Sequence, residues 1–134
     1  MKEYQFLIDQ AFDAMKNAYA IYSNYHVGAA ILLKNGMTIV GANIENASYG
    51  ATCCAERNAI FSAYSQGYRK EDIVAIAIVT DGKILAGPCG ICRQVLSELL
   101  NQDTPILLSN KSDFLRTTIA HLLPMQFGTK DVLK

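Results

Sequence analysis

Four cysteines and one glutamate are the residues of this sequence whose types and spacing best suit chemistry. Cys89 and Cys92 form a Cys-x-x-Cys pair, and the adjacent Cys53 and Cys54 come shortly before Glu56. Two thiolates with this spacing at the start of a helix converge on one cation, and the helix N-terminus lowers the pKa of a thiol there. If a second helix begins at Cys54, a third thiolate reaches the same ion. The pattern predicts a zinc site, because zinc favours sulfur ligands in tetrahedral geometry.

Two interpretations of this site differ in the number of ligands. If all four cysteines bind, the site is closed and only stabilises a noncatalytic binding domain. Adjacent side chains on a helix diverge by about 100°, and paired ligands of structural sites lie about two to four residues apart, so Cys53 and Cys54 fit this interpretation poorly. If three cysteines bind, water reaches the fourth position, and Glu56 is the proton carrier that such an open site needs. We favour the open site.

The spacing of apolar residues indicates which elements hold these side chains. Steps of three and four residues predict amphipathic helices, whereas short β-branched runs are typical of strands. Asn35-Gly36 between two such runs indicates an antiparallel hairpin. A strand, a helix and another strand in succession imply a parallel crossover. The predicted helices cover 3–22, 54–66 and 89–100, and the predicted strands cover 27–33, 37–42, 73–79 and 105–108.

The end of the chain adds weaker signals. Beyond residue 113 we expect one more strand, a short helix near Leu122 and an irregular tail after Pro124. The complete order predicts an α/β fold with a mixed five-stranded sheet that opens with an antiparallel hairpin. With 134 residues, the chain is expected to form a single domain over 1–134.

Composition narrows the classes of partner. Apolar residues make up 51% of the chain and charged residues 18%, which is typical of a folded protein. The 12 Lys and Arg balance the 12 Asp and Glu, so the chain lacks the basic field that attracts nucleic acid. No apolar stretch of about 18 residues suggests a membrane helix, and residues 1–10 lack the pattern of a signal peptide. We expect a cytoplasmic protein with reduced thiols and without a membrane partner.

The sequence also resembles the zinc-dependent cytidine deaminases, specifically the short homotetrameric kind with three cysteine ligands. The resemblance spans nearly the whole chain in the expected order, and it implies a three-layer α/β/α fold and a homotetramer. The segments that carry it are Cys54-Ala55-Glu56-Arg57, Pro88-Cys89-Gly90-Ile91-Cys92-Arg93-Gln94, Tyr22–Ala30, Gly41, Asn43–Tyr49, Leu122–Pro124 and Phe127.

The resemblance implies roles for the residues of the metal site. Cys54, Cys89 and Cys92 match the zinc ligands, and Glu56 matches the proton shuttle. The implied reaction is attack of zinc-activated hydroxide on C4 of cytosine, which converts cytidine and deoxycytidine to uridine and deoxyuridine with release of ammonia in pyrimidine salvage. Three thiolates leave the site with a net negative charge, and Arg57 matches a residue that donates hydrogen bonds to the ligand sulfurs.

Other matches concern a small nucleoside substrate. Asn43 and Glu45 match residues that bind the ribose, and their alternate positions in an extended segment favour one face. Tyr25 takes the place of a Phe that lies beside the base. Phe127 matches a C-terminal Phe that extends into a neighbouring subunit's site. For both aromatic residues, packing in the core is the competing interpretation.

Two other deaminase classes are alternatives. Blasticidin-type deaminases share the Cys-Ala-Glu and Pro-Cys-x-x-Cys elements but are not expected to keep Arg57, or Asn43 together with Glu45. Enzymes that edit polynucleotides are disfavoured by the neutral charge and by their usual His-x-Glu motif. His26 and His121 have no partner at metal-ligand spacing, so we expect neither to bind zinc.

Overall fold

A mixed sheet of five strands organises the computed structural model, which describes residues 2–133. The strand order is β2-β1-β3-β4-β5; β3 and β4 are parallel, and the other neighbouring pairs are antiparallel. The strands are β1 (Val27–Leu33), β2 (Thr38–Ala42), β3 (Ile73–Thr80), β4 (Ile106–Ser109) and β5 (Phe114–Thr117). The helices are α1 (Gln5–Met15), α2 (Ala55–Ser65), α3 (Gly90–Leu99), α4 (Ile119–Leu122) and α5 (Thr129–Val132), with short 3-10 turns at Lys2–Tyr4, Tyr49–Ala51 and Lys70–Asp72.

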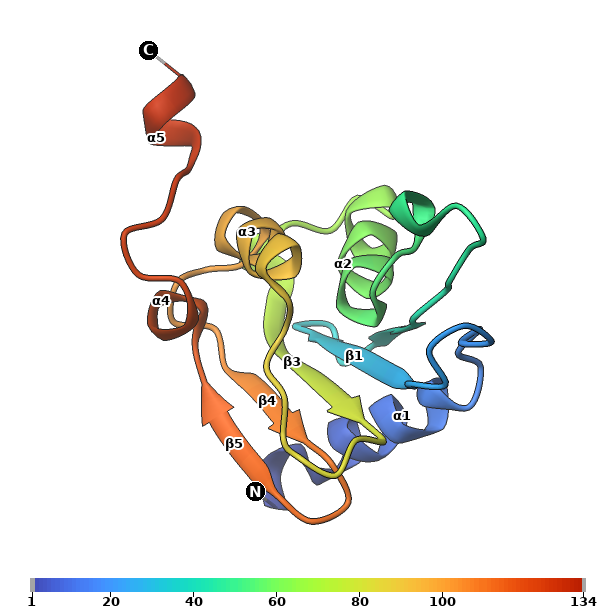
Figure 1. Ribbon diagram of the computed structural model, residues 1–134. Coiled ribbons are helices and arrows are strands. Elements are labelled where there is room, and N and C mark those ends of the chain that lie inside the picture. The colour runs from blue at the N-terminus through green and yellow to red at the C-terminus, as the bar shows by residue number, and fades with distance from the viewer. Residues whose placement is uncertain (1, 134) are drawn as a thin grey trace.

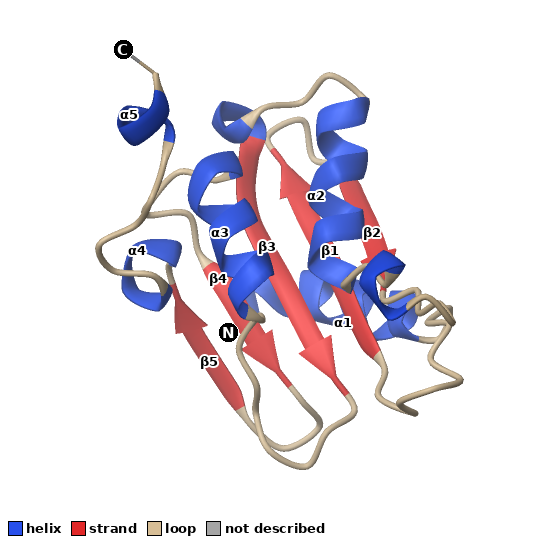
Figure 2. Cartoon of the chain, turned by 45° about the horizontal axis from the view of Figure 1, so that its top comes forward, coloured by secondary structure: helices blue, strands red, loops and turns tan. Residues whose placement is uncertain are grey.

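Helices cover both faces of the sheet (Figures 1 and 2). On one face, α1 buries Leu7 and Ala11 against strand residues such as Ala77. On the other face, α2 and α3 bury Ile60 and Leu96 in a larger core. Both faces of β3 are therefore covered, which explains its almost continuous apolar sequence. The predicted three-layer α/β/α fold with a mixed five-stranded sheet is confirmed.

Two glycines allow helices to lie directly on the strands. A Cβ atom on Gly28 of β1 would be 2.0 Å from the carbonyl oxygen of Ala11 in α1. A Cβ atom on Gly41 of β2 would be 2.6 Å from the carbonyl oxygen of Ala55 in α2. A side chain at either position would push the helix away from the sheet. Gly41 therefore allows the first turns of α2 to lie close to β2.

Most predicted elements are confirmed, but the first helix is shorter than expected. The spacing predicts a helix over 3–22, whereas α1 ends at Met15. The reason is a competing backbone pairing: the Tyr19 N–H donates to the Asn43 carbonyl, and the Glu45 N–H donates to the Tyr19 carbonyl, each at 2.9 Å. The segment after α1 is thereby held beside the end of β2. The predicted hairpin is present, and Gly36 supplies its left-handed residue with φ +87°.

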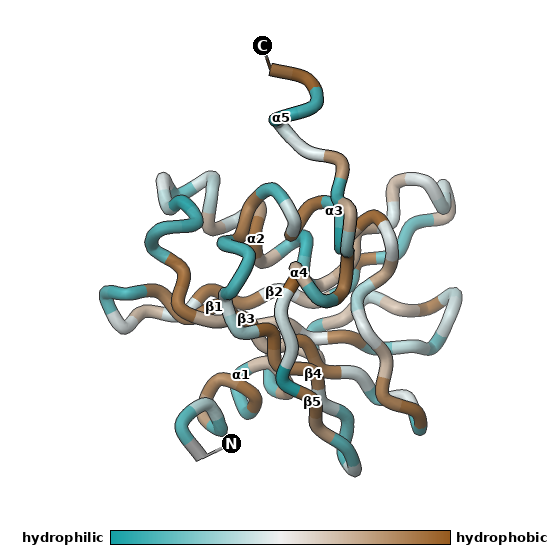
Figure 3. Tube along the Cα trace, turned by 90° about the vertical axis from the view of Figure 1, so that its left-hand side faces the viewer, coloured by the Kyte–Doolittle hydropathy of each residue, from teal (hydrophilic) through white to brown (hydrophobic). Residues whose placement is uncertain are grey.

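The C-terminal segment leaves the three layers after α4. The sequence predicts an irregular tail after Pro124, but the tail contains the short helix α5, and this part of the prediction is wrong. Figure 3 shows α5 standing apart from the sheet and its covering helices. Val132 and Leu133 are exposed there. Within residues 2–133, no helix combines the length and the apolar character needed to cross a membrane.

Candidate metal and catalytic site

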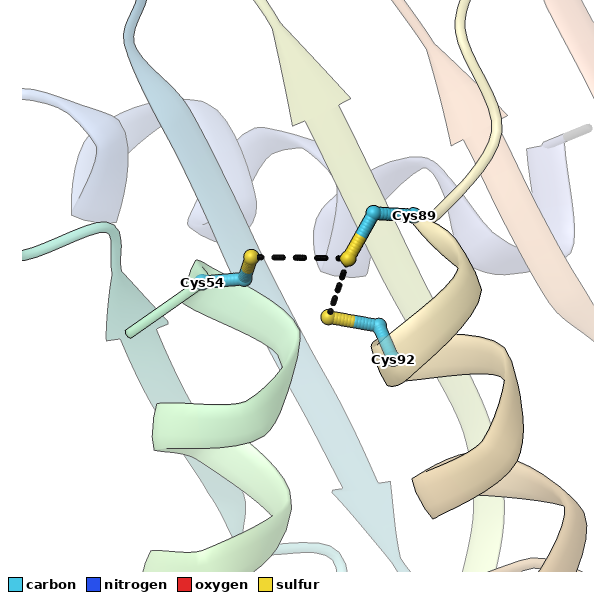
Figure 4. A group of neighbouring side chains, drawn as sticks. All are labelled: Cys54, Cys89 and Cys92. Carbon is cyan, nitrogen blue, oxygen red and sulfur yellow. Dashed lines mark hydrogen bonds between the residues drawn. The ribbon is translucent and has the colours of Figure 1, made fainter. Parts of the chain in front are cut away.

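Three cysteine sulfurs meet where two helices begin. Cys54 caps the N-terminus of α2, Cys89 caps that of α3, and Cys92 lies in the first turn of α3. The Sγ of Cys89 is 3.8 Å from that of Cys54 and 3.4 Å from that of Cys92, and all three lie within 4.8 Å of one another (Figure 4). The loop that enters each helix thus brings thiols from distant parts of the chain together.

These distances fit a zinc ion. Ligand sulfurs at about 2.3 Å from a tetrahedral zinc lie about 3.8 Å from one another. The pKa of the Cys54 thiol falls to about 5, because Cys92, Arg57 and Cys89 hydrogen bond to its sulfur and the charge of Arg57 favours the thiolate. The pKa of Cys92 rises, because its thiol proton bonds to Cys54 and because the side chain is buried away from water. These interactions favour the thiolate form of Cys54, the form that binds a metal ion.

Cys53 does not join the cluster. Its N–H and carbonyl pair with those of Ile44 at 3.0 Å, and in this extended backbone successive side chains point to opposite sides. Within residues 2–133, the cluster of potential metal ligands contains neither Cys53 nor His26 nor His121. The cluster offers three cysteines, which favours the interpretation with three ligands over the one with four.

Arg57 lies beside the cluster, one turn after Cys54. Its Nη2 donates to the Cys54 sulfur and to the Thr52 carbonyl, each at 3.5 Å. The contact with the Cys54 sulfur raises the pKa of Arg57, so the guanidinium remains charged. A permanent positive charge at this place offsets part of the negative charge of three thiolates. Its buried Nε finds no partner within the part of the chain that the structure describes.

Glu56 occupies the first turn of α2 and is 3% exposed. Burial raises the pKa of its carboxyl group to about 7, and the negative charge of Cys54 adds to this effect. A carboxyl group with such a pKa takes up and releases a proton near neutral pH. The sequence predicts this role from spacing, whereas the burial that suits it comes from packing.

Asn43 and Glu45 lie close together after β2. Both side chains form hydrogen bonds to the backbone of neighbouring segments. The Asn43 side chain accepts from the Val27 N–H at 2.9 Å and donates to the Tyr25 carbonyl at 2.8 Å. Glu45 accepts from the N–H groups of Tyr22 and Ser23 and from the Ser23 hydroxyl. These bonds lower the pKa of Glu45, the Ser23 hydroxyl contributing most.

Glu45 also borders a cavity of about 380 Å³. The residues around this cavity are Tyr22, Ser23, Glu45, Asn46, Tyr49 and Thr52. The sequence does not predict a role for Ser23, since nothing in the local pattern shows that its hydroxyl meets a carboxylate 22 positions away. The structure thus adds Ser23 to the group that surrounds Glu45.

The two predicted aromatic residues lie in different places. Tyr25 is exposed, and its ring edge lies close to Gly82, near the loop that leads to Cys89. Phe127 is 61% exposed on the projecting tail, where its carbonyl accepts from Gln94 at 2.9 Å. The alternative prediction, that both aromatic residues pack in the core, is therefore wrong.

Comparisons with known proteins agree with this geometry. Residues 1–107 match the family model described as the cytidine and deoxycytidylate deaminase zinc-binding region. A cytidine deaminase of Halalkalibacterium halodurans is 52% identical over 129 residues, which cover 96% of each protein. The crystal structure of a cytidine deaminase from Burkholderia pseudomallei is 45% identical, with a TM-score of 0.88 over 91% of this chain and 97% of that one.

A deaminase with another name is similar at a lower level. A blasticidin-S deaminase of Bacillus cereus is 34% identical over 111 residues, which cover 78% of this chain and 79% of that protein. This match is shorter than that of the Halalkalibacterium protein and has fewer identities.

Proposed function

Since the chain belongs to the cytidine and deoxycytidylate deaminase family, it is a zinc-dependent hydrolase that deaminates cytidine, and we propose that Glu56 carries the protons of this reaction. The single observation that supports this role is a carboxyl group buried beside three clustered thiols. Cys54, Cys89 and Cys92 are the residues that would hold the metal. When bound, zinc supplies a Lewis acid that makes water a stronger acid and a better nucleophile.

In the proposed mechanism, Glu56 acts first as a base and then as an acid. Its carboxylate accepts a proton from the attacking water and delivers that proton to N3 of the cytosine ring. The oxygen of water bonds to C4, and Glu56 then passes the second proton, from the new C4 hydroxyl, to the exocyclic amino group. The C4–N bond breaks, a C4 carbonyl forms and ammonia leaves, so one water is consumed for each uridine formed. Burial keeps bulk water from competing for the proton, and Arg57 limits the negative charge next to it.

We propose that the nucleoside sugar lies near Asn43 and Glu45 and that the base lies near Tyr25. A carboxylate and an amide suit the hydroxyls of a neutral sugar, which include those of deoxycytidine. The cavity beside Glu45 supports this placement. The exposed Phe127 on its projecting tail supports a homotetramer in which Phe127 enters a neighbouring site.

The proposal extends to the whole chain and its setting. Residues 1–134 form one deaminase domain, since a single sheet with one layer of helices on each face includes nearly all of them. Reduced thiols are needed for the metal, which supports a cytoplasmic role in pyrimidine salvage.

The direct test follows the ultraviolet absorbance of cytidine with the purified, zinc-loaded protein. We expect cytidine to be lost with one ammonia per uridine, activity to fall when a chelator removes the metal, and activity to return with zinc. Glu56→Gln should keep one zinc per chain and lose turnover by about 10²- to 10⁴-fold. Glu71→Gln, on an exposed glutamate, is the matched control and should remain active.

Each contrary result identifies a different error. Turnover retained by Glu56→Gln would remove Glu56 from the mechanism. If the zinc-loaded parent protein leaves cytidine intact, the noncatalytic zinc-stabilised domain becomes the better interpretation.

The similarity to a blasticidin-S deaminase supports a second candidate substrate. The presence of Arg57, and of Asn43 with Glu45, favours cytidine over blasticidin S. Turnover of the two compounds by the same preparation would separate these functions, and a clear preference for blasticidin S would reverse the assignment.

A further inference from the structure

Arg93 and Gln94 directly follow Cys92, and the proposed reaction uses neither side chain. Both residues lie on α3 and are partly buried. Their hydrogen bonds reach the residue before Cys89 on one side and the C-terminal part of the chain on the other. The structure therefore offers a reason for their presence beside a metal ligand.

Arg93 joins two segments that are far apart in sequence. Its Nε donates to the carbonyl of Pro88 at 2.7 Å, and its Nη1 donates to the carbonyl of Leu122 at 2.9 Å. Pro88 is buried and immediately precedes Cys89, while Leu122 is the last residue of α4. The chain also passes close to the guanidinium at Gly87, where an added Cβ would be 2.9 Å from Nη2.

Gln94 makes the next connection along the same segment. Its Nε2 donates to the carbonyl of Phe127 at 2.9 Å. Two consecutive residues of α3 thus hold Leu122 and Phe127, the two ends of the stretch that leads from α4 into the projecting tail. Figure 3 shows how far this tail extends beyond α3 and α4.

We propose that Arg93 and Gln94 are positioning residues that keep the turn before Cys89 and the tail before Phe127 in fixed relation to α3. Arg93 holds the backbone that presents the sulfur of Cys89. Gln94 sets where the tail leaves the body and therefore where the ring of Phe127 lies. The part that concerns Phe127 rests on the proposed function, whereas the part that concerns Cys89 rests only on the geometry of the metal site.

The chemistry of arginine explains why this residue type is needed at position 93. A guanidinium is planar and donates in several fixed directions, so one side chain serves two carbonyls at once. A lysine ammonium is a compact charge and does not reproduce this fork. Without the second donor, the buried carbonyl of Pro88 or the carbonyl of Leu122 loses its partner, and the turn before Cys89 loosens.

The first test measures how well the protein retains zinc. Arg93→Lys is compared with Arg69→Lys, because Arg69 also donates to two carbonyls, those of Tyr64 and Tyr68, but at the far end of α2. Transfer of zinc to a chromogenic chelator should be about 10-fold faster in Arg93→Lys than in the parent protein, whereas Arg69→Lys should release zinc at the parent rate.

Arg93→Ala adds a rescue arm to this test. Added guanidinium chloride at millimolar concentration should slow its zinc release, while ammonium chloride should not, because only guanidinium restores the fork. If Arg93→Ala does not fold, Arg93→Lys decides alone. Parent-like zinc release by Arg93→Lys, or equal acceleration in Arg69→Lys, would overturn the role of Arg93.

The second test concerns Gln94 and the tail. Gln94→Glu keeps the shape but removes the donor, and Gln66→Glu, at the exposed end of α2, is its control. Hydrogen exchange in the peptide 122–132 should accelerate in Gln94→Glu only. The KM for cytidine should rise about 2- to 10-fold with kcat and zinc retention nearly unchanged, as expected for a displaced aromatic contact.

Hydrogen exchange and KM test the role of Gln94 and the role of Phe127 separately. Unchanged exchange in the tail of Gln94→Glu would overturn its positioning role. Faster exchange with unchanged KM would mean that Gln94 holds the tail but that Phe127 does not meet the substrate, which contradicts the proposed function at that residue only.

Discussion

Cys53 and Cys54 are adjacent in the chain, yet the pKa values of their thiols are shifted in opposite directions. Hydrogen bonds from Cys92, Arg57 and Cys89 lower the pKa of Cys54 to about 5, whereas burial raises the pKa of Cys53. The difference arises because the extended backbone turns one side chain into the cluster and the other away from it. The environment of each thiol therefore differs between two adjacent residues, and it is set by partners from other segments of the chain.

Alkylation of the metal-free protein tests this difference. Because the pKa of Cys54 is lowered to about 5 and that of Cys53 is raised, iodoacetamide should label Cys54 faster than Cys53 between pH 6 and 7. Arg57→Gln should shift the onset of Cys54 labelling to higher pH, because the positive charge that favours its thiolate is gone. Peptide mass spectrometry identifies the labelled site, and faster labelling of Cys53 than of Cys54 would contradict the assignment.

At the scale of elements, the contact between α2 and β2 places one ligand. Gly41 lets the first turns of α2 rest on the strand, and a Cβ there would be 2.6 Å from the Ala55 carbonyl and 2.7 Å from the Ala59 nitrogen. Both atoms belong to the backbone, so the helix must move as a unit. Since Cys54 caps this helix, its sulfur would move too.

Gly41→Ala should therefore reduce both stability and zinc retention. Overpacking of this kind costs about 1–3 kcal/mol of unfolding free energy. Gly50→Ala is the control, because a Cβ at Gly50 meets no atom within 4 Å, and its effect should be within about 0.5 kcal/mol. Denaturant unfolding and chelator competition measure the two effects, and equal stability of both variants would show that α2 does not rest tightly on β2.

A second element contact joins the start of β1 to the end of β3. The Asp81 carboxylate accepts from the backbone N–H of His26 at 3.0 Å and bonds to the His26 ring. Partial burial raises the pKa of Asp81, but these hydrogen bonds outweigh that effect and hold the pKa below its usual 3.8. The ionised carboxylate therefore stabilises the folded state above pH 3.8, and this stabilisation is lost as the pH falls through the lower folded-state pKa.

Asp81→Asn should then lower the unfolding free energy by about 0.5–1 kcal/mol at neutral pH and by progressively less below pH 4. Asp103→Asn, on an exposed loop, serves as the control at each pH, so that acid-induced loss of metal affects both variants equally. A stability difference that persists unchanged at low pH would mean that the charge of Asp81 is not its source.

At the scale of the whole molecule, the proposed role of Phe127 makes the projecting tail the segment that would complete a site. Phe127 is exposed, and Gln94 holds its backbone at the outer side of α3. In the proposed homotetramer, such a tail would place the ring of Phe127 in a neighbouring site.

Coexpression of two defective chains tests this arrangement. Phe127→Ala should lower kcat/KM by about 10-fold, the value of one aromatic contact, and Glu56→Gln should be nearly inactive. Mixed assemblies contain sites with an intact Glu56 from one chain and an intact Phe127 from another. Their activity should exceed the average of the two parent assemblies, whereas activity equal to that average would place Phe127 in the site of its own chain.

The sequence by itself determined the chemistry of the site and most of the elements. The sequence alone indicates the site residues Cys54, Glu56, Cys89 and Cys92. Their positions relative to two helix starts depend only on short distances along the chain, which can be read directly from the sequence. The buried strands β3 and β4 are recognisable for the same reason, since a strand covered on both faces is apolar along its length.

Only the tertiary structure decided which cysteine is left out, where the first helix ends and what Asn43 and Arg93 hold. Each of these depends on hydrogen bonds between segments far apart in the chain, such as Tyr19 with Asn43 or Arg93 with Leu122. The spacing of apolar residues beyond Met15 still suits a helix. The N–H and carbonyl groups of Tyr19 instead hydrogen bond to the segment that follows β2, so they do not need helical partners. A backbone group bonds to whichever partner the packed elements bring within hydrogen-bond distance. The sequence pattern does not show which segments come that close in the folded chain.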